Sequence, residues 1–264
     1  MESAEHDAGD RSLIPAGSRG SPDAIYEHLR EKILCGDIPA GSDLVQAQVA
    51  KRYGVSRGPV REAFRLLQRE GLIEAQINVR AKVTDLTATE AEHLYALRVV
   101  NEALALRMSV PYFSPEELDE LDRLVASVGE SQARGFGAWE QQHERFHALL
   151  LVHAGARLCH SLAQWAEYTE RYRRVYVSDG TGGWTLGASE HQLIAAACRS
   201  RDTGSAIKLL ARHLSRAGLT LVATIDPQYE PQLLRAAVRQ VVPTDPGKGK
   251  AVPATTKHSS SADH

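Results

Sequence analysis

The chain contains few cysteines, few aromatic residues and no long apolar segment, and each shortage excludes a class of protein. Cys35, Cys159 and Cys198 are odd in number and far apart, without a C-x-x-C motif, which argues against a disulfide framework or a cysteine-based metal or redox site. The longest unbroken apolar run covers only residues 193–198, whereas a membrane-spanning helix needs about 20 residues. The acidic N-terminus lacks the apolar stretch of a signal peptide, so we expect a cytoplasmic protein without a membrane partner.

Positive charge is not abundant overall, because the formal net charge is −2, and this excludes a chain that is basic throughout. Residues 51–82 differ from the rest, since eight Lys and Arg side chains stand there against three acids. A local basic patch on a near-neutral chain of 264 residues fits a DNA-binding module joined to a regulatory one.

The segment VSRGPVREA at residues 55–63 is typical of the turn and recognition helix of a helix-turn-helix. Gly54 predicts the end of one helix, and Ser56 can cap the next. Arg57 and Arg61 lie one turn apart near the start of that helix, where they can reach guanine edges or phosphates in a major groove. The alternative is an ordinary amphipathic helix with a solvated basic face.

The surrounding residues predict a winged helix-turn-helix over 21–86, after a disordered tail over 1–20. Ser21-Pro22 predicts a first helix, a second is expected at about 45–52, and two short strands are expected at 72–77 and 81–83. The predicted DNA contacts, from the recognition helix and the wing, are Ser56, Arg57, Gly58, Arg61, Asn78, Arg80 and Lys82.

From Thr87 onward the pattern is helical, so we expect an all-α bundle over 87–226. Capping-box patterns predict helix starts at Thr87, Ser114 and Ser189. Further helices are expected at about 137–153, 156–177 and 202–222. Residues 227–264 are expected to form a mostly disordered extension with a short docked helix within 228–242. The predicted fold is therefore mainly α, with an N-terminal winged helix-turn-helix and a C-terminal helical bundle.

These motifs resemble the GntR family of bacterial transcription regulators, and within it the FadR-like subfamily with an FCD-type ligand-binding domain. The similarity covers about residues 21–226. Its main segments are Tyr26-x-x-Leu29-Arg30, Tyr53-Gly-Val-Ser-Arg-x-Pro-Val-Arg-Glu-Ala63, Arg69-Glu-Gly-Leu72-Ile73, Tyr95-x-Leu97-Arg98-x-x-x-Glu102, Phe146-His147-x-x-Leu150, Glu190-His191 and His213-Leu214. Two positions depart from the family, because Arg80 stands where the wing usually carries glycine and Ala47 where relatives often carry a DNA-contacting arginine.

The resemblance implies a metal site on three helices of the bundle, at His143, His147, His191 and His213. His143 and His147 are also spaced i and i+4, so they share one helix face and can chelate together. The family has an aspartate at the position of His143, so this chain would offer four imidazoles, which suit Zn²⁺ or Ni²⁺. The alternative is a structural or empty histidine site, with an effector bound elsewhere.

Arg98 is the candidate effector contact, because a guanidinium can grip a carboxylate through two hydrogen bonds. An ion pair with Glu102, one turn along the helix, is the alternative. Residues 143–147 also spell the H-E-x-x-H of zinc proteases. We place a zinc hydrolase third, because Glu144 adjoins His143 and is expected to point off the ligand face, and because a protease needs no DNA-binding module.

The sequence therefore predicts a homodimeric transcription regulator, a repressor rather than an enzyme, that binds a palindromic operator in double-stranded DNA. A small carboxylate effector bound in the metal-containing helical domain would control operator affinity.

Overall fold

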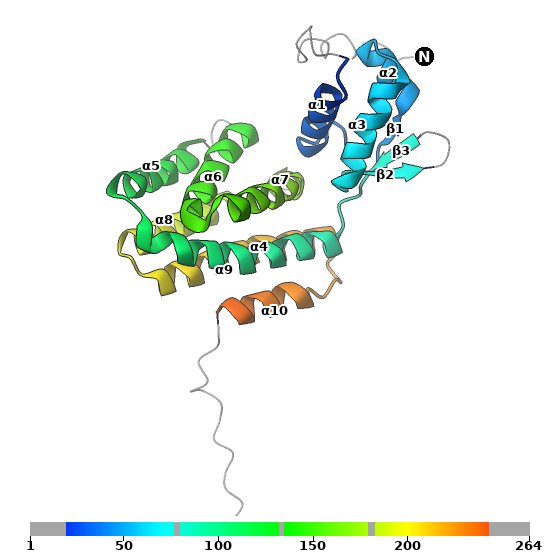
Figure 1. Ribbon diagram of the computed structural model, residues 1–264. Helices are drawn as coiled ribbons and strands as arrows, with labels where there is room; N and C mark the ends of the chain where they lie inside the picture. Colours follow the sequence, from blue (N-terminus) through cyan, green and yellow to red (C-terminus); the bar gives the residue numbers. More distant parts are fainter. Residues whose placement is uncertain (1–19, 77–79, 132–134, 179–182, 243–264) are drawn as a thin grey trace, which may run out of the picture.

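The computed structural model describes residues 20–76, 80–131, 135–178 and 183–242, and it has two parts joined at residues 84–87 (Figure 1). The N-terminal part contains α1 (Pro22–Leu34), α2 (Gln46–Tyr53) and α3 (Arg57–Arg69). Three short strands, β1 (Asp43–Val45), β2 (Ile73–Gln76) and β3 (Arg80–Val83), form an antiparallel sheet in the order β1-β3-β2. This arrangement is the predicted winged helix-turn-helix.

Local chemistry explains the turn between α2 and α3. Gly54 adopts the left-handed conformation (φ 68°, ψ 33°) at the end of α2, which glycine does without steric cost. Ser56 occupies the N-cap position of α3 with extended backbone, but its hydroxyl makes no capping hydrogen bond, contrary to expectation. The sequence also missed β1, whose Leu44 pairs with Ala81 of β3.

The wing does not need glycine at position 80. Arg80 begins β3, where it pairs with Gln76 of β2 and Val45 of β1. Among the described non-glycine residues only Arg201 has a positive φ, so the backbone at Arg80 is not strained. Asn78 lies within residues 77–79, outside the described part of the chain.

Among the described residues, every regular element of the C-terminal part is a helix. Its helices are α4 (Ala88–Ser109), α5 (Pro115–Ser131), α6 (Phe136–Leu150), α7 (Ala156–Ser178), α8 (Gly183–Arg199), α9 (Thr203–Ile225) and α10 (Gln232–Val241), with one-turn helices η2 (Val110–Tyr112) and η4 (Val152–Ala154). The cap at Thr87 forms, and Ser114 and Glu117 make a reciprocal capping box. The predicted start at Ser189 is wrong, because α8 already begins at Gly183.

Helix α4 lies at the centre of this part, where it contacts α7, α9 and α10 (Figure 1). Gly218 allows α9 to approach α4, since a Cβ at this position would lie 2.7 Å from the ring of Tyr95. The buried Glu92 of α4 accepts hydrogen bonds from the Leu234 amide and the Tyr229 hydroxyl, which fix α10 in place. A docked helix thus lies within the segment 227–264, while residues 243–264 are outside the described part. No helix in the described ranges combines the length and apolar character that crossing a bilayer requires.

Candidate metal centre and nucleic-acid interface

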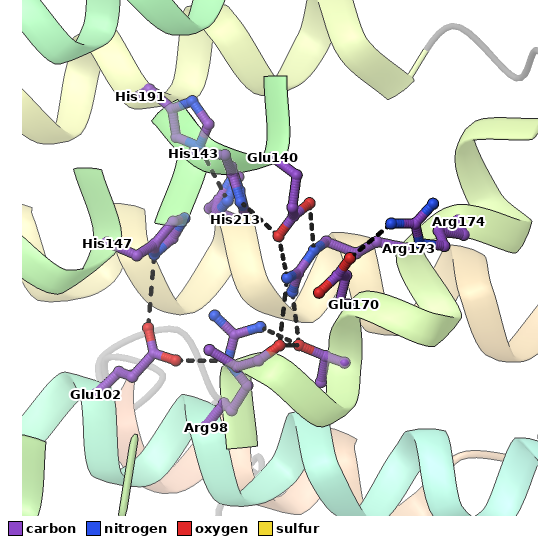
Figure 2. A network of polar contacts seen from close by, with 12 residues as sticks. Arg98, Glu102, Glu140, His143, His147, Glu170, Arg173, Arg174, His191 and His213 are labelled. Atoms are coloured by element: carbon purple, nitrogen blue, oxygen red, sulfur yellow. Dashed lines mark hydrogen bonds and ion pairs between the residues drawn. The ribbon is translucent and has the colours of Figure 1, made fainter. Parts of the chain in front are cut away.

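The helical bundle brings the four predicted histidines together from three helices. His143 and His147 come from α6, His191 from α8 and His213 from α9, and all four are buried (Figure 2). One ligand nitrogen from each lies within 4.8 Å of the other three. The group is a cluster that could hold a metal ion.

The protonation and hydrogen bonding of the histidine nitrogens are compatible with a bound cation. Burial is the largest cause that lowers the pKa of His147 to about 4, and burial likewise lowers the pKa values of His143 and His191 well below the usual range. Neutral imidazoles carry a lone pair that can bind a metal. Nε2 of His191 lies 3.3 Å from Nε2 of His213, and Nε2 of His147 is buried without a hydrogen-bond partner among the described residues. A buried imidazole nitrogen without a partner, close to three further imidazoles, is expected where a metal ion binds.

Three of the imidazoles have a carboxylate near their other ring nitrogen. Nδ1 of His213 lies 2.8 Å from Oε2 of Glu190. Nδ1 of His147 is 3.6 Å from Oε2 of Glu102, and Nδ1 of His143 is 3.8 Å from Oε1 of Glu140, both beyond hydrogen-bond distance. Carboxylates behind metal-binding histidines fix the ring orientation and raise the basicity of the ligand.

Each of these carboxylates is held in turn by an arginine. The Nε atom of Arg98 donates to Glu102 at 2.5 Å, that of Arg173 to Glu140 at 3.0 Å and that of Arg216 to Glu190 at 2.8 Å. Burial opposes ionisation of Glu102, but Arg98 and His147 outweigh it and lower the pKa of Glu102 to about 2. Neither Glu140 nor Arg173 was predicted from the sequence as part of the site. A search for acids three or four residues from each histidine could have found Glu140.

Arg98 is therefore not a free guanidinium. It is 2% exposed, bonded to Glu102 and, through a second nitrogen, to the Thr169 hydroxyl at 2.9 Å. The ion pair that the sequence left as the alternative is present. Arg98 still borders a cavity of about 280 Å³ beside the histidines. The cavity is lined by Arg98, Glu102, His143, Glu144, Arg145, His147, Ala148, Leu151, Cys159, Leu162, Ala163, Ala166, Glu167 and Arg173.

Glu144 lines this cavity together with His143 and His147, but it is not among the residues that line the smaller cavity of about 50 Å³ bordered by all four histidines. Burial, followed by the charge of Glu140, raises the pKa of Glu144 to about 7.

The candidate DNA contacts of α3 lie on its outer face. Val60, Ala63, Phe64 and Leu67 are buried against the rest of the domain, which leaves Ser56, Arg57, Gly58 and Arg61 exposed at the N-terminal end. Arg80 is exposed at the start of β3. Lys82 is partly exposed and forms an ion pair with Asp85 at 2.7 Å. Both arginines of the predicted contact set on α3, Arg57 and Arg61, are thus accessible to a partner.

A winged helix-turn-helix joined to a helical bundle that contains a cavity is the architecture of a DNA-binding transcription regulator. The family model "Bacterial regulatory proteins, gntR family" matches residues 22–83, and the model "FCD domain" matches residues 93–216. The chain belongs to the GntR family and carries an FCD domain. Its function is that of a DNA-binding transcription regulator with an effector-binding domain.

Individual relatives agree with this assignment. The chain is 29% identical to the HTH-type transcriptional regulator BphR of Paraburkholderia xenovorans (strain LB400), over 78% of this chain and 87% of the relative. It is 24% identical to the HTH-type transcriptional repressor GlaR of Escherichia coli (strain K12), over 72% and 90%. The solved structure of E. coli McbR/YncC covers 76% of this chain and 96% of its own, with a TM-score of 0.64 and 18% identity, and supports the fold alone.

Proposed function

We propose that this regulator is a cytoplasmic homodimeric repressor whose affinity for a palindromic operator responds to a small organic acid bound beside a metal ion. The observation that carries the proposal is the buried group of four imidazoles, with one nitrogen of each within 4.8 Å, next to a cavity that can admit a small molecule. The exposed arginines of α3 supply the DNA-binding end of the same chain.

Operator recognition would depend on Arg57 and Arg61 in the major groove, with Ser56 and Gly58 at phosphates. Asn78, Arg80 and Lys82 of the wing would add contacts, and Lys82 would have to exchange its partner Asp85 for a phosphate. Selection of tight binders from a random duplex library tests this part. A palindromic consensus is expected, and failure to enrich any sequence at physiological salt would contradict it.

The metal would be bound by His143, His147, His191 and His213, and a set of neutral imidazoles favours Zn²⁺, with Ni²⁺ as the second choice. When bound, the ion would supply a Lewis-acidic positive charge that attracts a carboxylate. Metal content measured by mass spectrometry on wild type and His147→Ala tests the ligand set. Equal stoichiometric metal in both proteins would exclude His147 as a ligand. If the metal is present but no acid alters operator affinity, the site is structural and the effector binds elsewhere.

Dimerisation is supported by an exposed apolar stripe on α4 and η2. Leu97, Leu104, Met108 and Tyr112 are 44%, 51%, 44% and 72% exposed, and their spacing places them on one side of the helix. Such a stripe is typical of an interface between copies of a chain. Leu104→Glu should shift the protein to monomer in analytical ultracentrifugation. Leu233→Glu on α10, where the leucine is 48% exposed, is the matched control and should remain a dimer.

A zinc hydrolase is the third candidate, after a regulator with a structural histidine site, and its basis is that Glu144 lines the same cavity as His143 and His147. Glu144→Gln separates the two functions. A regulator should retain metal and operator binding in this variant, whereas a peptidase activity present in wild type and lost in the variant would favour the hydrolase.

A further inference from the structure

Helix α7 of the helical bundle lies against α1 of the winged domain (Figure 1). Arg30 of α1 is the centre of this contact. Its Nε atom donates to both oxygens of Glu70, at the end of α3, at 3.1 and 3.2 Å, while another nitrogen pairs with Glu167 of α7. The Arg30 side chain is only 15% exposed, so Glu70 and Glu167 together neutralise a largely buried cation.

Two neighbours of Glu167 extend the contact. Tyr168 packs against the hydrophobic cores of both parts of the molecule. Arg171, one turn after Glu167, donates to the carbonyl oxygen of Thr84 at 2.8 Å, in the segment that joins the two parts. One face of α7 therefore contacts both the winged domain and the segment that connects this domain to the helical bundle.

The other face of α7 lines the cavity beside the histidines. Leu162, Ala163 and Ala166 form part of its wall, and Thr169 accepts hydrogen bonds from Arg98 and Arg173. Glu167 belongs to both faces, since it lines the cavity and also pairs with Arg30. Its side chain is 39% exposed, so it can exchange one partner for another at a modest cost.

We infer that Glu167 is the positioning residue through which the content of this cavity acts on the winged domain. A hydrogen-bond donor or cationic group inside the cavity competes with Arg30 for the Glu167 carboxylate. Release of Arg30 leaves it with Glu70 alone and loosens α1 from α7. The effector class that this favours is an acid with an amino or hydroxyl group at its other end. The effector class rests on the proposed function, whereas the contact between the domains does not.

Hydrogen–deuterium exchange of the full-length protein tests the contact without DNA or effector. Glu167→Gln and Arg30→Gln should each raise exchange in α1 by about fivefold or more, and the double variant should match the larger single effect within about twofold. Peptides from α5 and α9 should exchange as in wild type. Wild-type exchange in Glu167→Gln, or additive effects in the double variant, would overturn the inference. Glu167→Asp, which keeps the charge, should be intermediate and carries the test if Glu167→Gln does not fold.

Because the effector is not identified, a second experiment introduces a positive charge into the cavity by substitution. Ala163 lies one turn before Glu167 and lines the cavity, so Ala163→Lys places an ammonium within reach of that carboxylate. It should reproduce the exchange increase in α1, while Ala163→Met, of similar length without charge, should not. Equal exchange in the two variants would refute competition for Glu167. Operator affinity, measured on a duplex selected with wild type, should change by the same factor in Glu167→Gln and Ala163→Lys; if wild type selects no duplex, the proposed function fails while the exchange result stands.

Discussion

Glu190→Gln is the sharpest test of how the histidine cluster is organised. Glu190 lies 2.8 Å from Nδ1 of His213, which directs Nε2 of that ring toward His191. Burial opposes ionisation of Glu190, but hydrogen bonds with His213 and Arg216 outweigh it and lower the pKa of Glu190 to about 2, so the group is a carboxylate at neutral pH. Loss of a carboxylate behind a metal-binding histidine reduces metal affinity by about 10–100-fold, or about 1.4–2.8 kcal/mol.

The variant should remain folded, because Glu190 and Arg216 are 22% and 25% exposed and water can solvate the released guanidinium. Zinc affinity is measured by competition with a chromophoric chelator at neutral pH. Glu117→Gln is the matched control, since Glu117 makes a similar 2.9 Å contact with His153 away from the cluster. A zinc affinity within twofold of wild type in folded Glu190→Gln would refute the proposed role of this carboxylate.

Three further predictions concern DNA, packing and metal removal. Arg57→Ala should weaken operator binding by roughly 1–3 kcal/mol and relax base preference in a mobility-shift assay, whereas Arg69→Ala, ~18 Å further along α3, should have little effect. Gly218→Ala should lower the free energy of unfolding by about 1–2 kcal/mol in urea, because the added methyl group overlaps Tyr95 and this outweighs the gain in helix propensity; an unchanged midpoint would contradict it. Chelation should lower the melting temperature of wild type but not of His147→Ala, with a loss of about 2.7 kcal/mol if metal was present at a hundredfold its Kd.

The helix starts show what local sequence determines. Thr87 and Ser114 cap their helices as predicted because the capping bonds join residues three apart, so the signal is complete within four letters. The same pattern at Ser189 misled, since α8 begins at Gly183. The helix as a whole packs against α5 and α9, and tertiary packing of this kind can extend a helix beyond its local start signal. The strand β1 was missed because its only signal is pairing with β3, nearly forty residues later.

In the histidine site, too, some features could be predicted from local sequence and others depend on the fold. The i, i+4 spacing of His143 and His147 could be read from one helix, whereas the other two histidines were found through the family resemblance. The partners of Arg98 could not all be predicted from the sequence, because Thr169 of α7, which binds a second nitrogen of Arg98 at 2.9 Å, comes close only in the folded chain. Long-range contacts of this kind carry no periodic signal.

The charges around the cluster balance in pairs, and this determines what a bound cation would add. The pairs are Arg98–Glu102, Arg173–Glu140 and Arg216–Glu190. Neutral imidazoles cancel none of the charge of a divalent ion, unlike thiolates or ligating carboxylates, so the loaded site would hold uncompensated positive charge in a buried place. An acid entering the adjoining cavity would compensate it. Metal and acid would then strengthen each other's binding by the same factor, so saturating acid should raise zinc affinity as much as zinc raises acid affinity. Unequal factors would exclude a single linked site, and equal factors near one would place the acid away from the histidines.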